Sequence, residues 1–127
     1  MPKTQPFRMP VKWEDLPNFQ VREHVSRAGF RGEDVLLVMN WLEKGMTLGM
    51  HSHPFEQIAL ILAGRMRWTV GDETFEMGAG EVLRVPPNVP HGGIPISDET
   101  VINLDIFCPI RDDYRHIVDH QKDDFDD

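Results

Sequence analysis

Three histidines and a glutamine in the middle of the chain are spaced to hold a metal ion. His51 and His53 are two residues apart, so in an extended strand their side chains point to the same side. Gln57 keeps the same parity, and His91 follows in a second segment bounded by glycine and proline. Imidazole and amide groups are donors that divalent transition ions accept. The spacing therefore predicts one metal site made of His51, His53, Gln57 and His91.

The fourth ligand of this site has one rival. Glu56 precedes Gln57 and carries a carboxylate, but its parity is opposite, so it would reach the ion only if the strand contained a bulge. We favour Gln57 because side chains alternate along a strand, and we leave Glu56 open as the alternative. Four neutral ligands leave the ion its full charge, and such a site attracts anionic oxygen ligands. Ni, Zn, Mn, Fe and Co all suit these donors, so the ion stays open.

Short strand-like segments surround these residues and would position them. Glycine and proline separate the segments, and no helical period precedes residue 111. The expected strands are 35–42, 57–62, 65–70, 74–77, 81–85 and 101–107. Gly71-Asp72 marks a hairpin turn between two of them. This pattern predicts an all-β fold, built as an antiparallel sandwich or barrel.

Composition divides the chain into three parts. Residues 1–17 contain four prolines and are expected to form an N-terminal arm, residues 18–114 the barrel, and residues 115–127 an acidic tail. The last nine residues include five aspartates and one aromatic side chain, so we expect the tail to be disordered. An arm of this kind can exchange between two copies of a chain, and we expect a homodimer.

Charge and cysteine content indicate the compartment and the partners. With 21 acidic and 13 basic side chains, the formal charge of -8 repels nucleic acid and anionic membranes. The longest apolar run, 58–63, is too short to span a bilayer, so no membrane partner is expected. The single cysteine, Cys108, excludes an internal disulfide and favours a reducing compartment, the cytoplasm. We expect this thiol to be buried and inert.

The two glycine-bounded segments together closely resemble the two motifs of the cupin superfamily. The first runs Gly45-x5-His51-x-His53-x3-Gln57-x6-Gly64, and the second, fifteen residues later, runs Gly80-x5-Pro86-x-Asn88-x2-His91. The chain departs from the usual pattern at three positions: Gln57 stands for Glu, Asn88 for Gly and Pro95 for Asn. The resemblance implies a single-domain cupin barrel, which is an antiparallel jelly roll or double-stranded β-helix.

A narrower resemblance, to the KdgF family of small cupins in pectin degradation, spans most of residues 13–114. It rests on Trp13-Glu14-Asp15-Leu16, on His53-Pro54 with Gln57, and on residues 85–92 and 105–114. In that family three histidines and a glutamine hold the metal, and these fall on His51, His53, Gln57 and His91. The residues implicated in its activity fall on Asp105, Phe107 and Arg111. The resemblance implies a metal-dependent enzyme that converts cyclic 4,5-unsaturated uronates to linear 4-deoxy-5-keto uronates.

The residues themselves are compatible with these roles. In 101–107, branched aliphatic side chains alternate with Asn103, Asp105 and Phe107, which share one face. Asp105 is our candidate for proton transfer, and the planar fork of Arg111 suits the carboxylate of an anionic substrate. Polarity alone leaves open whether Asp105 faces the pocket or water, and whether Phe107 is a simple core residue. Three other arginines are expected on solvent-facing strand positions: Arg65, Arg67 and Arg84.

Other functions remain possible for the same site. A three-histidine cupin site can hold Fe(II) and act as a dioxygenase, which iron content and oxygen consumption would reveal. A cupin lyase can use the ion as a Lewis acid without the set of Asp105, Phe107 and Arg111. A non-catalytic module can hold a sugar or small acid in the same pocket. All of these alternatives share a small-molecule ligand.

Overall fold

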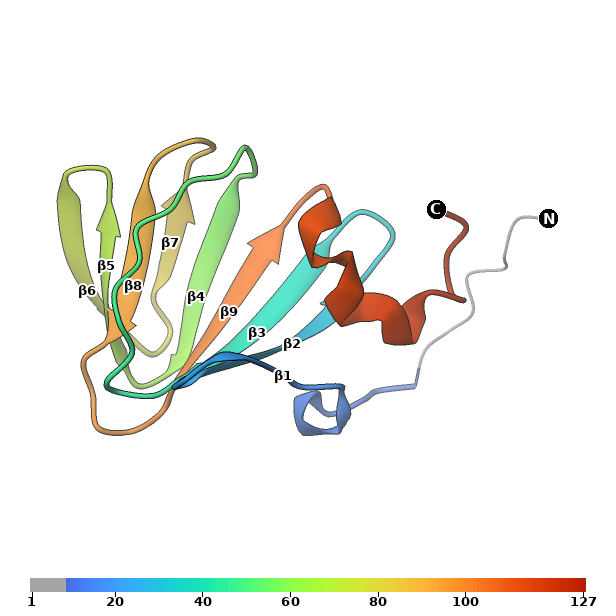
Figure 1. Cartoon of the computed structure of the whole chain (residues 1–127), viewed down its shortest axis with the longest axis horizontal. Coiled ribbons are helices and arrows are strands. Elements are labelled where there is room, and N and C mark those ends of the chain that lie inside the picture. Colours follow the sequence, from blue (N-terminus) through green and yellow to red (C-terminus); the bar gives the residue numbers. More distant parts are fainter. Residues whose placement is uncertain (1–8) are drawn as a thin grey trace.

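Nine strands and two helical segments make up residues 9–127, the part of the chain that the computed structural model describes (Figure 1). Their bounds are η1 Trp13–Asp15, β1 Phe19–Arg22, β2 Val25–Arg31, β3 Leu36–Leu42, β4 Gln57–Ala63, β5 Arg65–Val70, β6 Glu73–Gly78, β7 Val82–Val85, β8 His91–Pro95, β9 Val101–Phe107 and η2 Asp112–Gln121. No helix in the described range is both long and apolar enough to cross a membrane. The predicted all-β fold is confirmed.

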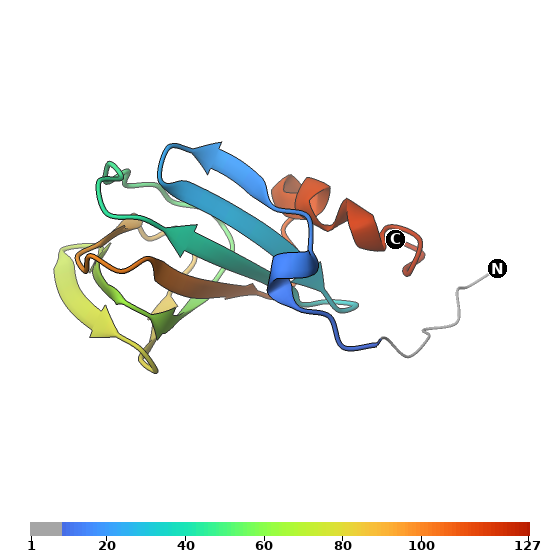
Figure 2. The same ribbon diagram turned by 90° about the horizontal axis from the view of Figure 1, so that it is seen from below.

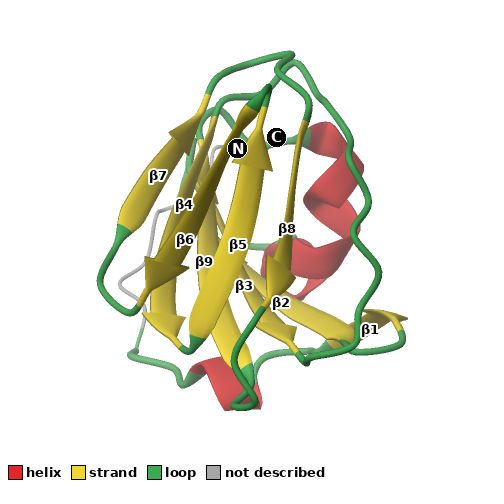
Figure 3. Ribbon diagram, turned by 90° about the vertical axis from the view of Figure 1, so that its left-hand side faces the viewer, coloured by secondary structure: helices red, strands yellow, loops and turns green. Residues whose placement is uncertain are grey.

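The strands form two antiparallel sheets that face each other as a jelly-roll sandwich. The larger sheet has the order β1-β2-β3-β9-β4-β7, and the smaller has the order β6-β5-β8. Figure 3 shows the smaller sheet in front of the larger one. The predicted hairpin joins β5 to β6: Val70 pairs with Glu73, and Gly71 adopts the positive φ of 59° that this tight turn requires.

The inner face of the larger sheet carries two separate apolar cores. The inter-sheet core lies between the sheets and consists of Val25, Leu42, Ala59, Ile61, Met66, Trp68, Met77, Val85 and Val101. The C-terminal core lies toward the other end and consists of Leu36, Val38, Phe107, Ile110, Ile117 and Val118. Figures 1 and 2 show η2 at the end of the molecule away from β5 and β6, where it covers this second core.

The C-terminal residues are ordered against β2, which corrects the predicted disorder of residues 115–127. Ile117 is 1% exposed and packs on Gly29, where a Cβ atom would lie only 2.8 Å from the Ile117 side chain. Phe125 is buried, and the Arg31 guanidinium lies 4.0 Å from the centre of its ring. The acidic composition of the tail gave no sign of these apolar contacts. They depend on Gly29 of β2, which leaves room for the Ile117 side chain.

The N-terminal segment lies along the outer face of the larger sheet. Part of the predicted arm, residues 1–8, lies outside the described residues. From Met9 onward the arm borders an apolar groove that it shares with Phe30 of β2 and Leu37 of β3. Farther along the outer face, the side chains of β4 and β9 are also apolar and half-buried, including Ile58, Leu104 and Ile106. The homodimer stays a prediction.

Candidate metal centre and active-site cavity

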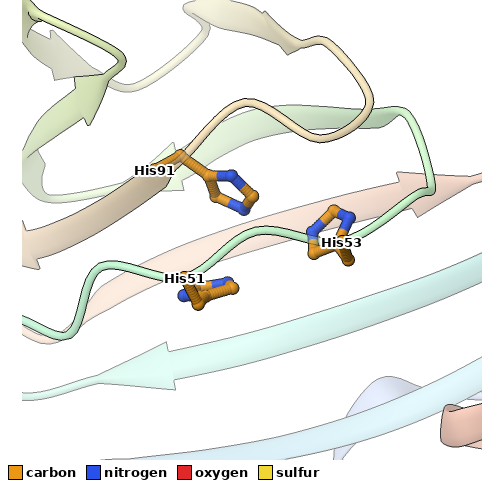
Figure 4. Close-up of side chains that lie close together, drawn as sticks. All are labelled: His51, His53 and His91. Atoms are coloured by element: carbon orange, nitrogen blue, oxygen red, sulfur yellow. The ribbon is translucent and has the colours of Figure 1, made fainter.

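The three histidines come together where the loop after β3 meets the start of β8. His51 and His91 form an isolated antiparallel bridge, with backbone N···O distances of 2.9 and 2.8 Å. His53 follows two residues later on the same loop, and the Asn88 N–H donates to its carbonyl oxygen at 2.7 Å. Figure 4 shows the three rings turned toward one another. Backbone pairing between the two motifs therefore places the imidazoles side by side.

The distances within the cluster suit a single ion. One ring nitrogen from each of His51, His53 and His91 lies within 4.8 Å of the other two. Two nitrogens that bind the same zinc-type ion, each at about 2.1 Å, are separated by at most about 4.2 Å. A shift of less than an ångström in the rings therefore brings them to coordination distance. The cluster could hold a divalent metal ion.

Hydrogen bonds favour one tautomer in all three rings. Each Nδ1 lies against a backbone carbonyl: His51 at 3.2 Å from Gly49, His53 at 2.8 Å from Phe55 and His91 at 2.8 Å from Val89. A carbonyl oxygen can only accept, so Nδ1 is the nitrogen that carries the proton in the neutral ring, and Nε2 of that tautomer has the lone pair. Burial lowers the pKa of His53 and of His91, and the Arg111 charge lowers that of His53 further. Neutral rings with free Nε2 atoms are metal ligands.

Two atoms in this cluster lack the partner that a metal ion would supply. The Nε2 atom of His91 is buried and has no hydrogen-bond partner among the described residues. The Gln57 Oε1 atom lies 3.2 Å from His53 Nε2, so an acceptor faces another acceptor once His53 is protonated at Nδ1. Such a contact is favourable when a cation lies beside both atoms. The residues present therefore fit a bound metal ion.

The structure places Gln57, and not Glu56, beside the histidines. Gln57 begins β4 and is 4% exposed, with its amide directed at His53. Glu56 points to the outside and pairs with Arg84 of β7. This is the side-chain alternation on which the preference for Gln57 was based.

Asp105 lies next to Gln57 on the inner face of the larger sheet. Its carboxylate accepts hydrogen bonds from the side-chain amides of Asn103 at 2.8 Å and Asn40 at 3.0 Å. Gln57 also lies within hydrogen-bonding reach, which directs the Gln57 NH2 group to Asp105 and its oxygen to the histidines. Burial raises the pKa of Asp105, and these amide hydrogen bonds oppose the shift. Asp105 therefore connects the cavity to the candidate metal ligands.

Phe107 and Arg111 lie on the other side of the histidines. Phe107 is 1% exposed, and its ring meets the His53 ring edge-on at a centroid distance of 5.9 Å, so it belongs to both the core and the cavity wall. The Arg111 guanidinium stacks on Tyr114 at 3.9 Å and donates two hydrogen bonds to Asp113, at 3.0 and 2.6 Å. The Nε and Nη2 atoms of Arg111 are therefore already used by Asp113, and Nη1 is left to bind a ligand.

These residues border a cavity of about 290 Å³ that opens beside His51. Its lining includes three arginines and a single carboxyl group, that of Asp105, among the described residues. Sequence reasoning did not assign Arg22, Arg27 or Tyr114 to the site. Arg27 lies on β2, which had not been predicted as a strand, and Tyr114 lies in η2. Alternation of Val25, Arg27, Gly29 and Arg31 along one face is the signal that could have drawn attention to β2.

Several other side chains lie away from the cavity. Arg65, Arg67 and Arg84 are 54, 45 and 61% exposed, as expected for solvent-facing positions. The Cys108 thiol is exposed, so the expectation that it is buried is wrong; the residue follows the end of β9, where the chain turns outward. His116 contacts Phe19, and His120 Nε2 bonds to the Gly29 carbonyl, so neither is near the three-histidine cluster.

Comparison with curated proteins gives a relative of known name. The chain is 33% identical over 97 residues to a protein named H2HPP isomerase from Bacillus subtilis. This match covers 76% of the present chain but 38% of the relative, so the chain spans well under half of that protein's length.

Solved structures share the fold at lower sequence identity. An RmlC-like cupin from Shewanella frigidimarina superimposes with a TM-score of 0.75 at 23% identity, covering 87% of this chain and 99% of that one. KdgF from a Halomonas species gives a TM-score of 0.72 at 20% identity, covering 79% of this chain and 92% of that one. These likenesses agree with the jelly roll described above.

A family match connects the fold to the site. The cupin domain family model, Cupin_2, matches residues 38–107. This range begins in β3, ends with β9 and contains the three histidines, Gln57 and Asp105. The jelly roll, the motif spacing and this match, which covers more than half of the chain, agree with one another. The chain belongs to the cupin family.

Proposed function

We propose that this cupin is a metal-dependent isomerase that opens cyclic 4,5-unsaturated uronates to linear 4-deoxy-5-keto uronates. The observation that carries the proposal is the composition of the cavity, which His51 of the three-histidine cluster and Gln57 line together with Asp105 and three arginines. A cationic cavity in a chain with a formal charge of -8 favours an anionic substrate. Among the described residues, Asp105 is the one carboxyl group that lines the cavity, which suits a reaction that moves one proton.

The metal would be held by His51, His53, His91 and the amide oxygen of Gln57. A divalent ion of the Ni, Zn, Mn, Fe or Co type would supply a Lewis acid for oxygen atoms of the substrate. The chain orients these ligands through backbone carbonyls at the three imidazoles and through Asp105 at the Gln57 amide. Partners of this kind hold a ligand in the tautomer and direction that coordination needs.

The proposed reaction moves a proton and leaves the oxidation level unchanged. The anomeric hydroxyl loses its proton as the bond between C1 and the ring oxygen breaks, and the enolate left at C5 takes up a proton at C4. Reactant and product are isomers, so no oxidant or reductant is required. We assign the proton transfer to Asp105, which lies in the cavity and is held by the amides of Asn40 and Asn103. Phe107 and Tyr114 wall the cavity and limit the access of water.

One experiment tests the uronate assignment directly. Purified protein, loaded with each candidate ion in turn, is given unsaturated galacturonate or guluronate freshly made by a polyuronate lyase. We expect faster loss of the ultraviolet absorbance of the conjugated C4–C5 double bond than in buffer or in metal solution alone. A rate equal to the uncatalysed rate with every ion would refute the assignment.

A second candidate has its own support in the 33% identity to the H2HPP isomerase. Under this alternative the same residues would isomerise H2HPP, the compound in the name of that relative. The two candidates are distinguished by giving both substrates to the same metal-loaded protein. Turnover of H2HPP with no turnover of unsaturated uronates would replace the first proposal with the second. We propose the cytoplasm as the location for either activity, because the one cysteine is a free thiol.

A further inference from the structure

Buried polar side-chain atoms without partners gather in the cavity. Among the described residues, four such atoms lack a hydrogen bond: Arg27 Nε, Trp68 Nε1, His91 Nε2 and Asn103 Oδ1. His91 Nε2 is a candidate metal ligand, and the residues that carry the other three all line the cavity. Buried polar atoms in folded proteins nearly always have a hydrogen-bond partner. Three buried atoms without one in a single cavity therefore indicate a site for a ligand.

Each of the three atoms is held in place by its surroundings. Arg27 pairs across the larger sheet with Asn40, which in turn pairs with Asn103, so all three side chains share the inner face. The Arg27 guanidinium lies 5.1 Å from the centre of the Tyr114 ring. Asn103 donates its NH2 group to Asp105, which leaves its oxygen free to accept. Trp68 lies on β5 of the smaller sheet, opposite Arg27 and Asn103, and its ring stacks beside that of His91 on the neighbouring strand β8 at a centroid distance of 6.4 Å.

The two arginines deep in the cavity differ in their freedom to bind. Arg111 gives two donors to Asp113, so most of its fork is occupied. The Arg27 Nε atom is buried and has no hydrogen-bond partner among the described residues, and the guanidinium contacts Tyr114 and acts on Asp105 only through its charge. A guanidinium in this state presents paired N–H groups that match a carboxylate. Arg27 is therefore better placed than Arg111 to anchor an anion.

We propose that Arg27, Asn103 and Trp68 form a binding subsite for a hydroxy-carboxylate beside the three-histidine cluster. Arg27 binds the carboxylate, the Asn103 oxygen accepts the hydrogen of a hydroxyl group, and the Trp68 N–H donates to an oxygen of the ligand. The set has two donors and one acceptor, which chloride or sulfate cannot satisfy because neither has a hydrogen to donate to Asn103. The inference rests on the proposed function in taking a uronate as the ligand, but it concerns binding and not turnover.

Charge selectivity in binding tests the role of Arg27. D-galacturonate, a saturated uronate, and its uncharged methyl ester are titrated calorimetrically into wild-type protein, Arg27→Met, Arg27→Lys and the surface control Arg67→Met. We expect wild-type protein and the control to prefer the acid, Arg27→Met to lose at least about tenfold in affinity for the acid alone, and Arg27→Lys to lie between. General damage to the fold would weaken acid and ester together.

Removal of the indole N–H tests the second donor. Trp68→Phe keeps an aromatic ring against His91, and we expect weaker binding of both the acid and the ester because the lost contact is to an uncharged oxygen. Circular dichroism and thermal melting of each variant establish that it is folded before titration. A wild-type protein that binds the acid no better than the ester, or an Arg27→Met variant that keeps the preference, would overturn the subsite.

The outcomes separate this inference from the proposed reaction. Titrations are carried out with metal-loaded and with chelator-treated protein, because Arg27 should confer acid selectivity in both. If acid selectivity depends on Arg27 but unsaturated uronates are not turned over, the proposed subsite is supported and the proposed reaction is rejected. Turnover of unsaturated uronates with an unchanged KM in Arg27→Met would leave the reaction and reject the subsite.

Discussion

The inter-sheet core and the C-terminal core are closed in different ways. In the inter-sheet core, Ile61 of the larger sheet belongs to one cluster with Met66 and Trp68 of the smaller sheet, so strands cover it on both sides. In the C-terminal core, Ile117 and Val118 of one short helical segment take the place of the second sheet. The cavity lies between the cores and draws its lining from both. One wall of the cavity is therefore supported by two packed sheets, and the other by a sheet covered by η2.

Helical segment η2 and the residues after it, which we call the C-terminal cover, are attached to β2 by side chains distant in sequence. β1 pairs with β2 only as far as Arg27, which leaves the edge of β2 near Arg31 without a strand partner. The Gln121 amide fills this edge by accepting from the Arg31 N–H at 2.8 Å and donating to the Arg31 carbonyl at 2.9 Å. The histidines, in contrast, are positioned by backbone bonds between two short motifs. The comparison separates the metal side, which is the three-histidine cluster with Gln57 and is set by two short motifs, from the C-terminal cover, which is set by long-range side-chain contacts.

Loss of one histidine should have the largest effect on the metal side. We expect His91→Ala to lose the bound ion and turnover, because its Nε2 atom is the buried unpartnered donor of the cluster. His116→Ala, on the cover, is the matched control and should keep both. Elemental analysis of metal per chain after loading and dialysis measures the difference. Equal metal content in the two variants would contradict the assignment of the site.

Asp105→Asn should separate chemistry from metal binding. We expect a fall in turnover of about 10²- to 10⁴-fold, the range for loss of a general acid or base. The three imidazoles remain, so the variant should still bind the ion. Asp98→Asn is the control, since Asp98 pairs with Lys44 on the surface. Turnover close to wild type in Asp105→Asn would remove this residue from the mechanism.

The metal side could be predicted because its residues fall in two short motifs, each with a recognisable spacing. His51, His53 and Gln57 follow one another with the parity of an extended chain, and glycine-bounded turns mark the strands around them. The same alternation in β9 placed Asp105 and Phe107 on one face, and only the folded chain decides that this face is the inner one. The local sequence pattern therefore predicted the metal ligands and strand β9, but not which face of β9 points inward.

Strand β2 and the ordered C-terminal residues were not predicted, because their residues depend on distant partners. β2 places Arg27 and Arg31 on the inner face, where a sequence pattern leads one to expect apolar residues. Arg31 is satisfied there by Gln121, Phe125 and Asp127, about 90 residues away. Neither the sequence of β2 nor that of the acidic C-terminal segment predicts an ordered structure by itself. The ordered tail follows from their combination.

Matched truncations in the two cores should sharpen the contrast. Ile61 and Ile117 are 0 and 1% exposed, so we expect either change to alanine to lower the free energy of unfolding by about 2–5 kcal/mol. Only Ile117→Ala should raise KM, because Ile117 holds the segment that carries Tyr114. Metal content should stay unchanged in both. Chemical denaturation and steady-state kinetics measure these effects, and an equal rise in KM would argue against separate roles for the two cores.

The smallest effect is expected from the ion pair between Asp127 and Arg31. The hydrogen bond from Arg31 holds the pKa of Asp127 at about 2, below the model-peptide value of 3.8. A lowered pKa in the folded state stabilises the protein above pH 4, and this contribution disappears as the pH falls from about 4 to about 2. Because Asp127 is 44% exposed, Asp127→Asn should lower stability at neutral pH by less than about 1 kcal/mol.

The pH dependence gives this prediction its control. Wild-type protein and Asp127→Asn should differ in unfolding free energy at pH 7 and converge as the pH approaches 2, because protonated Asp127 no longer pairs with Arg31. Asp98→Asn, which removes the exposed ion pair between Asp98 and Lys44, should leave hydrogen exchange of the η2 amides unchanged. A constant difference between wild type and Asp127→Asn at every pH would mean that Asp127 stabilises the cover by packing and not by its charge.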